Sequence, residues 1–355
     1  MTRERITALF LLFIISIFIP TFVANGQLSE VSYVSTKIDG TLGDGTTSNT
    51  NVFSPSVSNN GLYVVFASDS TNLVPNDTNG VSDIFIKNTQ TGKIDILSKL
   101  SSGELGNGAS TLPTITPDGR YVVFTSTAKN LGVPVNVAQS VFIVDRNGDD
   151  NEANNILSLI SVDLSGNTIQ NSPSVSKTNN TVSEDGQLAV FTSTGVIAGT
   201  TDTNNNSDVF LWSKATGKTV LVSHIPASST TTGSSSSDLA SISGDGKYVL
   251  FSSMANNLVA SGPTVANFHV YLYEVATGKI TWISQGFATQ SGHMNANMSS
   301  DAEFIVWPTF AQYDTSIDSD AYQDIYRYQR STGEVLMVTT TNYLTKDNPF
   351  NSEMM

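Results

Sequence analysis

Short runs of β-branched and aromatic residues alternate with Gly- and Asp-rich turns along nearly the whole chain. One phrase, in its fullest form Ser/Thr-x-Asp-Gly-x-Tyr-Val-x-Phe, returns five times, and its copies begin at Ser58, Thr116, Ser183, Ser243 and Ser299. Downstream comes a strand-like pair, usually after an acidic residue, and then, in every unit but the second, a Thr-Gly turn and a last apolar run. No useful helical periodicity follows the N-terminal region, so each unit predicts four short strands.

The repeated unit predicts an all-β chain in a single domain over residues 27–355. The repeats span about residues 53–98, 112–161, 172–223, 239–284 and 294–339. A four-stranded sheet cannot cover both of its faces alone, so five such units predict a β-propeller whose blades lean on one another. The Val-Val-Phe runs are continuous, as expected for strands buried on both faces.

The phrase, the Asp-Ile-Phe strand and the Thr-Gly-x-x-x-x-Leu-Ser ending resemble the repeat of TolB-type propellers, also described as WD-like repeats of exported proteins. The resemblance covers about residues 31–339 and implies a six-bladed ring that usually serves as a binding platform. It does not imply a partner. TolB itself has an additional N-terminal α/β domain that is not found here, so a role in its membrane-spanning complex is not carried over.

The two ends of the chain depart from a count of five complete blades. Residues 30–36 resemble the fourth strand of a unit, and residues 348–352 resemble the start of a first strand. One interpretation is a sixth blade split between the termini and lacking its middle strands, which leaves the ring incomplete. The other is a five-bladed ring with two spare end strands.

Residues 1–26 read as a secretory signal peptide. Arg3 and Arg5 precede an apolar run from Ala8 to Ile19, and small residues follow at Ala24 and Gly26. The run is shorter than the roughly 20 residues of a membrane-spanning helix, and no later segment approaches that length. We therefore expect an exported protein in the periplasm, on the cell surface or outside the cell, with no membrane span in the mature chain.

Composition narrows the class of partner. The 355 residues are 39% hydrophobic and 14% charged, which is wrong for a disordered chain. A formal net charge of −14 opposes binding to nucleic acid or anionic lipid. The chain has no cysteine, so disulfides and thiolate chemistry are excluded. We expect a monomer that binds a protein or a cell-envelope component and requires no cofactor.

Acidic loops between the second and third strands are the strongest chemical signal. Three units share the spacing D-x-N/D-x-x-x-D, with oxygen-bearing side chains at Asp77, Asn79, Asp83, Asp202, Asn204, Asp208, Asp318, Asp320 and Asp324. Oxygens at alternate positions of a turning loop can converge on one hard cation, so these residues are candidate calcium ligands. The alternative is purely structural, because Asp and Asn also suit tight turns and the last Asp can anchor the third strand.

No catalytic set is assembled in the sequence. A G-x-S-x-G elbow is absent, the three histidines are scattered, and the serine-rich tract of residues 228–237 is interpreted as a solvated linker. We therefore predict a non-enzymatic binding scaffold. The one role considered for a metal is stabilisation of the fold by calcium. The alternative is a secreted polysaccharide hydrolase or lyase that uses acidic residues in the propeller channel.

Overall fold

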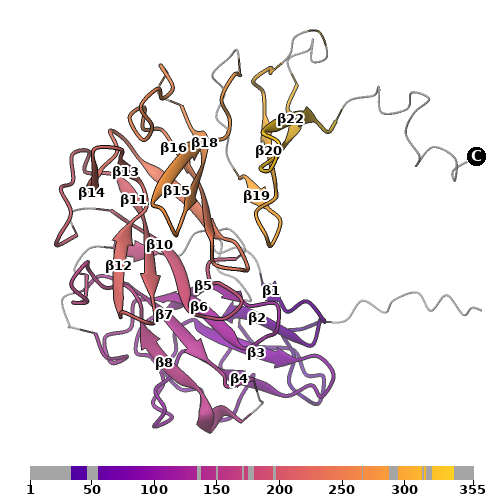
Figure 1. The fold of residues 1–355 in the computed structure, drawn as a ribbon. Helices are drawn as coiled ribbons and strands as arrows, with labels where there is room; N and C mark the ends of the chain where they lie inside the picture. Colours follow the sequence, from indigo (N-terminus) through magenta and orange to yellow (C-terminus); the bar gives the residue numbers. More distant parts are fainter. Residues whose placement is uncertain are drawn as a thin grey trace, which may run out of the picture. The chain divides into compact units, whose positions relative to one another are not determined.

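The computed structural model describes residues 33–45, 55–133, 137–148, 151–169, 172–174, 180–194, 197–265, 267–287, 295–313, 316 and 322–339. These residues form five four-stranded antiparallel sheets and one two-stranded ribbon (Figure 1). The expected β-propeller of four-stranded blades is confirmed. Over the described residues, no helix is both long enough and apolar enough to span a bilayer. The predicted signal peptide and the segment 348–352 lie outside the described residues.

Each blade is an up-and-down meander whose strands follow one another in the chain. The first blade contains β1 (Ser56–Val57), β2 (Tyr63–Ser68), β3 (Asp83–Asn88) and β4 (Ile94–Ile96). The second contains β5 (Ser110–Ile115), β6 (Tyr121–Ser126), β7 (Ser140–Asp145) and β8 (Ile156–Leu159), with a 3-10 helix, η1 (Glu152–Asn154), in its insertion. The third contains β9 (Ser172–Ser174), β10 (Leu188–Thr194), β11 (Ser207–Ser213) and β12 (Lys218–Leu221). The fourth contains β15 (Ser237–Ile242), β16 (Tyr248–Ser253), β17 (His269–Glu274) and β18 (Lys279–Trp282). The fifth contains β19 (Asn297–Met298), β20 (Phe304–Thr309), β21 (Asp324–Gln329) and β22 (Glu334–Met337).

The repeated phrase forms the turn between the first and second strands. In the second blade the Thr116 hydroxyl donates to Asp118 Oδ1 over 2.6 Å and accepts the Tyr121 N–H over 3.0 Å. Asp118 Oδ1 also accepts the Arg120 N–H over 2.9 Å. Gly119 has φ of 80°, a left-handed conformation that glycine adopts without a Cβ clash. The side-chain bonds therefore close a turn that the Asp-Gly pair makes accessible, and the same motif sets the register of the other blades.

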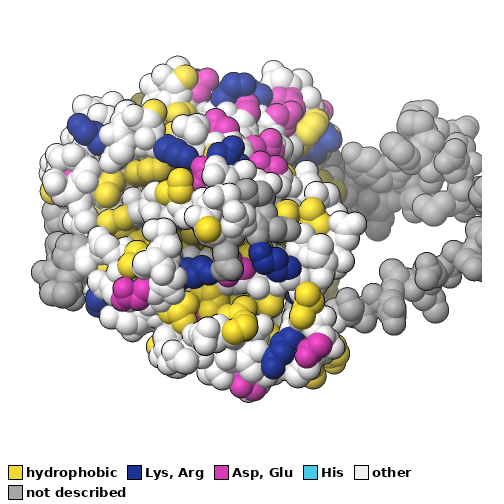
Figure 2. Space-filling view, turned by 90° about the horizontal axis from the view of Figure 1, so that it is seen from below, with side chains coloured by type: hydrophobic (Ala, Val, Ile, Leu, Met, Phe, Trp, Pro, Cys, Tyr) yellow, Lys and Arg dark blue, Asp and Glu magenta, His cyan; other side chains and the backbone are white. Residues whose placement is uncertain are grey.

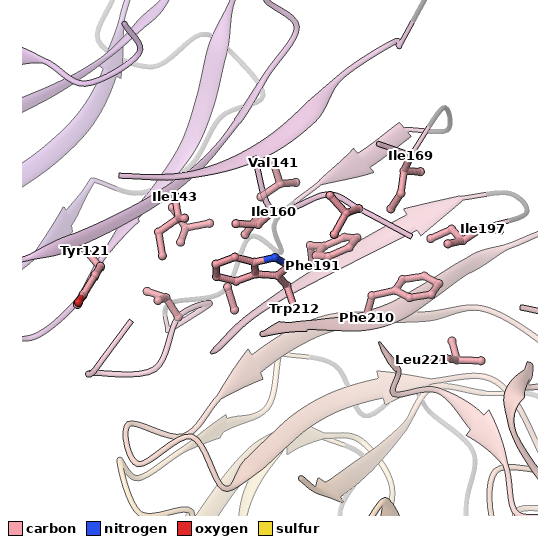
Figure 3. Close-up of a cluster of buried hydrophobic side chains, with 14 residues drawn as sticks. Tyr121, Val141, Ile143, Ile160, Ile169, Phe191, Ile197, Phe210, Trp212 and Leu221 are labelled. Atoms are coloured by element: carbon pink, nitrogen blue, oxygen red, sulfur yellow. The ribbon is translucent and has the colours of Figure 1, made fainter. Parts of the chain in front are cut away.

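Where two blades are neighbours, the apolar side chains on their facing sides pack together and are buried. Figure 3 shows the cluster where the second blade meets the third: Val141, Ile143 and Ile160 pack against Phe191, Phe210 and Trp212. The rings of Phe191 and Phe210 stack with centroids 5.7 Å apart, and the equivalent pair recurs in the first, second and fourth blades. Fully burying one such ring stabilises the fold by about 1.5–3 kcal/mol.

A second contact between blades repeats at the start of the second strand. A cation that follows the third strand of one blade lies over the tyrosine that begins the second strand of the preceding blade. The pairs are Arg146 over Tyr63 at 4.2 Å, Lys214 over Tyr121 at 5.3 Å and Arg330 over Tyr248 at 4.6 Å. Between the third and fourth blades the two positions are Leu188 and Val275, which pack in one apolar cluster. At this one joint, both members of the cation–π pair are therefore replaced by aliphatic residues.

The serine-rich tract between the third and fourth units is not the solvated linker that the sequence analysis expected. β14 (Ser228–Thr232) pairs with β13 (His224–Ile225), and Ser237 is fully buried at the start of β15. The ribbon repeats a hairpin that follows the fourth strand elsewhere, marked by the bridges Lys99↔Leu105 and Val162↔Thr168. Ser and Thr suit this element because β-branched threonine favours strands and the hydroxyls bond to nearby backbone.

Candidate functional site

The last Asp of each predicted acidic loop lies at the start of a third strand and is held by the fourth strand. Asp83, Asp208 and Asp324 are 0%, 3% and 8% exposed. Each carboxylate accepts a hydrogen bond from a hydroxyl just beyond the fourth strand, donated by Ser98, Ser223 and Thr339 respectively. The hydroxyl oxygen in turn accepts the N–H of the residue that follows the Asp. The arrangement is a latch between the third and fourth strands, formed by the Asp carboxylate and a side-chain hydroxyl.

The latch survives where the Asp is replaced. Ser140 and His269 occupy the Asp position in the second and fourth blades, and the hydroxyls of Ser161 and Ser284 still accept the N–H of Val141 and Val270, each over 3.0 Å. His269 is buried and lies edge-on to Trp282, with ring centroids 5.3 Å apart. The hydroxyl is therefore the constant part of the latch, and the Asp is an addition that three blades carry.

The middle residues of two loops tie each loop to the hairpin that follows the fourth strand. Asn79 Nδ2 donates to Asp83 Oδ2 over 2.7 Å and to the Gly106 carbonyl over 2.9 Å. Asn204 Nδ2 donates to the Gly233 carbonyl over 2.8 Å. In this arrangement the amide nitrogens of both residues point inward, and the Asn79 nitrogen reaches the carboxylate that calcium would share.

Burial dominates the electrostatics of these carboxylates. It raises the pKa of Asp83 to about 6 and that of Asp208 to about 7, against the opposing hydrogen bonds of Ser98 and Ser223. Burial also raises the pKa of Asp77. Groups so deeply buried cannot touch a polysaccharide, so Asp83 and Asp208 are not placed to act as its acid and base.

In the acidic loops of the first and third blades, only some of the predicted calcium ligands are placed to share a cation. Oδ1 of Asp202 accepts the N–H groups of Asn204 and Asn205, each over 2.9 Å, while its buried Oδ2 has no partner among the described residues. Asp318 and Asp320 lie outside the described residues. Within the described ranges, no three Asp, Glu or His side chains converge as a ready-made metal site. Calcium binding stays a prediction.

A groove beside the first blade is the better candidate for a binding site. It has a volume of about 580 Å³ and lies between the hairpin closed by Thr36 and Leu42, the loop of residues 71–76 and the start of β4. Leu73, Val74 and Ile94 supply apolar lining. The polar groups at the groove are Lys37, Asp39, Asn72, Asn76 and Lys93. A cavity of this size, mostly apolar with a few polar groups, is typical of ligand sites.

The hairpin that forms one wall of the groove is fastened to the first blade by hydrogen bonds. Lys87 Nζ donates to the Thr36 carbonyl over 2.8 Å, and Asn72 Nδ2 donates to the Leu42 carbonyl over 3.2 Å. The wall nevertheless exposes large apolar side chains, because Ile38 is 72% exposed and Leu42 is 54% exposed. Figure 2 shows one face of the molecule, on which hydrophobic side chains reach the surface between scattered Lys, Arg, Asp and Glu.

A smaller cavity of about 260 Å³ lies between the fourth and fifth blades, with Glu274, Lys279, Tyr328 and Arg330 among its lining residues. Its charged groups are largely engaged inside the protein. Arg330 donates to the Tyr248 hydroxyl over 3.0 Å and pairs with Glu303 at 3.3 Å, while Glu274 accepts the Thr277 hydroxyl over 2.6 Å. The cavity therefore offers less room than the groove beside β4.

Neither the groove nor its residues were identified from the sequence. The groove combines positions that are up to 57 residues apart, and none of them belongs to a recognisable motif. The one usable signal was Ile38, an apolar residue beside the turn residues Asp39 and Gly40, where the equivalent hairpin of the next unit has Ser101. The third equivalent hairpin also has an apolar residue at this position, Leu164, which packs against the cluster between the second and third blades, so the residue type alone does not mark a partner contact.

Comparison with known proteins finds only distant structural similarity. No protein-family model matches the chain, and no curated protein matches it. Among solved structures, a protein assigned as TolB from Agrobacterium tumefaciens is 13% identical, with a TM-score of 0.45, over 80% of this chain and 79% of that protein. The tricorn protease is 14% identical, with a TM-score of 0.44, over 82% of this chain but 26% of the protease. An oligogalacturonate lyase from Vibrio parahaemolyticus is 10% identical, with a TM-score of 0.39, over 86% of this chain and 82% of the lyase.

These similarities correct one prediction. The chain was predicted not to be an enzyme, and that prediction is not supported, because the similar structures include a protease and a lyase. The error came from treating an unassembled catalytic set as evidence about function. A propeller can carry its active-site groups on loops that no short motif marks.

Proposed function

We propose that this protein is an exported β-propeller that recognises a protein or cell-envelope component through the groove beside β4. The observation that carries the proposal is the groove itself, whose volume of about 580 Å³ combines the apolar side chains of Leu73, Val74 and Ile94 with the charged groups of Lys37, Lys93 and Asp39. Its hairpin wall leaves Ile38 and Leu42 exposed on a segment that hydrogen bonds hold to the blade. A pre-formed apolar wall lowers the entropic cost of binding.

The chemistry of the groove favours a partner segment with a large apolar side chain next to an acidic group. The apolar side chain would lie against Val74 and Ile94, and the acidic group would approach Lys37 or Lys93. The net charge of −14 repels acidic partners at long range. The two lysines would attract an acidic group only at short range, once the partner lies at the groove.

The test is a pull-down from a cell-envelope extract with purified wild-type protein, Ile38→Asp and a control, Ile156→Asp. Both isoleucines are exposed, at 72% and 57%, so neither substitution opens the core, and only Ile38 lines the groove. We expect one partner to be retained by the wild type and the control and lost from Ile38→Asp. Equal retention by all three proteins would refute the assignment of the groove.

We also propose that calcium stabilises the acidic loop of the third blade. The buried, unpartnered Oδ2 of Asp202 and the raised pKa of Asp208 support this, because a bound cation would satisfy the first and favour ionisation of the second. Thermal melting with and without calcium tests the proposal, as described in the Discussion.

A further inference from the structure

The forward face of each blade is the one that packs against the next blade, and in the fifth blade this face is exposed. The residue after the latch position is fully buried in four blades, as Ile84, Val141, Val209 and Val270, whereas Ile325 is 41% exposed. The last apolar residue of the unit is at most 3% exposed in the same four blades, as Leu97, Ile160, Val222 and Ile283, whereas Val338 is 47% exposed.

At one position of this face, the fifth blade carries a charged residue where the other four blades carry an aliphatic one. Four blades place a buried aliphatic residue two positions after Ile325 or its equivalent, and the fifth places Arg327 there; the four are Ile86, Ile143, Leu211 and Leu272, each 4–5% exposed. Cross-strand pairing puts Arg327 beside Val306 and Leu336, on the face of Ile325. An ordinary apolar blade would leave this guanidinium buried without a partner, so the fifth face suits a different occupant.

Arg327 is poorly paired within its own blade. Its guanidinium lies over the Phe304 ring at 5.1 Å, and its nearest carboxylate oxygen, on Glu334, is 3.9 Å away. Its Nε is buried and has no hydrogen-bond partner among the described residues. Phe304 is 38% exposed and occupies the position at which the tyrosines of other joints receive a cation from the following blade. The face therefore offers an aromatic ring, a cation and a carboxylate around an apolar centre.

We propose that the forward face of the fifth blade, defined by Phe304, Ile325, Arg327, Glu334 and Val338, binds the same face of a second copy of this chain. With a two-fold axis that passes between Arg327 and Glu334, each of these groups faces the other in the second copy, so the Arg327 guanidinium can reach Glu334 across the interface. Glu334 is available because its side chain is 51% exposed. The mixture of charges on one face is thus self-complementary.

Head-to-tail packing on the first blade fits the structure less well. The backward face of that blade is already covered, since Phe66 and Phe85 are 3% and 0% exposed and pack with Val34 and Leu73. The residue after its third strand is Thr89, whose hydroxyl donates to the Gly61 carbonyl over 2.7 Å. Thr89 supplies neither the cation nor the aliphatic contact found at the other joints.

The expected dimer is weak. Four strands about 4.8 Å apart and two to six residues long present a face of roughly 300 Å². Two such faces cover less than the roughly 1,200–2,000 Å² typical of stable complexes, so we expect a dissociation constant in the micromolar range. Sedimentation velocity over a concentration series that brackets this range should show a reversible monomer–dimer equilibrium for the wild type.

Two single variants and a control test the assignment. Ile325→Asp and Val338→Asp should abolish the dimer, and Val220→Asp, which alters a residue 48% exposed on β12, should leave it unchanged. Circular dichroism and melting curves identical to the wild type show that each variant is folded. Glu334→Lys, which places two cations together at the interface, should weaken the dimer at least tenfold.

A wild-type protein that stays monomeric at all concentrations overturns the proposal. The same result is expected if another segment of the same chain covers the face, and that outcome also overturns it. A dimer that survives both Ile325→Asp and Val338→Asp overturns it as well. Because the groove beside β4 is on another blade, failure of this test leaves the proposed function untouched.

Discussion

Replacing Asp208 by asparagine should stabilise the protein at neutral and alkaline pH. Asp208 is 3% exposed, and burial raises its pKa to about 7 despite the hydrogen bond from the Ser223 hydroxyl. Above that pH the folded chain must hold a buried carboxylate with only polar neutral partners, with Asp202 adding repulsion. Asparagine has nearly the same shape, keeps an oxygen that can accept the Ser223 hydroxyl, and carries no charge.

The sign and size follow from proton linkage. A carboxyl whose pKa is higher in the folded state stabilises the fold below its unfolded pKa, and this stabilisation is lost as the pH rises through the folded pKa. An unfolded pKa of about 3.9 against a folded value of about 7 makes the wild type lose about 4 kcal/mol of unfolding free energy between pH 4 and pH 8. The unpaired amide N–H of the introduced asparagine costs about 1–2 kcal/mol at every pH. Asp208→Asn should therefore be slightly less stable than the wild type near pH 4 and about 2–3 kcal/mol more stable near pH 8.

Urea denaturation followed by tryptophan fluorescence, in chelator and at several pH values across this window, measures the difference. Asp301→Asn is the matched control, because the Ser299 hydroxyl lowers the pKa of this exposed carboxyl, so its contribution is already present above about pH 4 and stays nearly constant across the window. If Asp208→Asn is less stable than the wild type by the same amount at every pH, the ionised carboxylate is favourable in the latch and the reasoning fails.

Three further predictions concern the core, the joints and calcium. Phe191→Ala removes a fully buried ring between the second and third blades and should lower the unfolding free energy by about 3–5 kcal/mol in urea titration, whereas Phe191→Leu should cost far less. Arg146→Gln removes both the cation over Tyr63 and the hydrogen bond from Arg146 to the Gly119 carbonyl, and should lower the unfolding free energy by about 1–3 kcal/mol in the same titration; an unchanged unfolding free energy would refute the role of this joint. Millimolar calcium should raise the melting temperature of chelator-treated wild type but not of Asp202→Asn, and an unchanged wild-type curve would count against calcium.

The blade frame was predictable because its determinants are local and repeated. The Asp-Gly turn, the buried Val-Val-Phe strand and the Ser or Thr that ends each unit recur at nearly constant spacing, so the strand order followed from the sequence. The sequence also placed Asp83 and Asp208 together with the start of the third strand. It did not show that Ser98 and Ser223 lie against them, because that contact depends on pairing between strands 15 residues apart.

The sequence by itself determined that the chain folds into five like sheets, since each sheet needs only its own turns and apolar runs. The groove beside β4 and the exposed forward face of the fifth blade were decided only by the tertiary structure. Exposure depends on what packs against a side chain, and Ile325 follows an Asp in a third strand just as the buried Ile84 does. Only the absence of a following blade among the described residues separates the two, and this is a property of the assembled sheets that the sequence of one repeat does not contain.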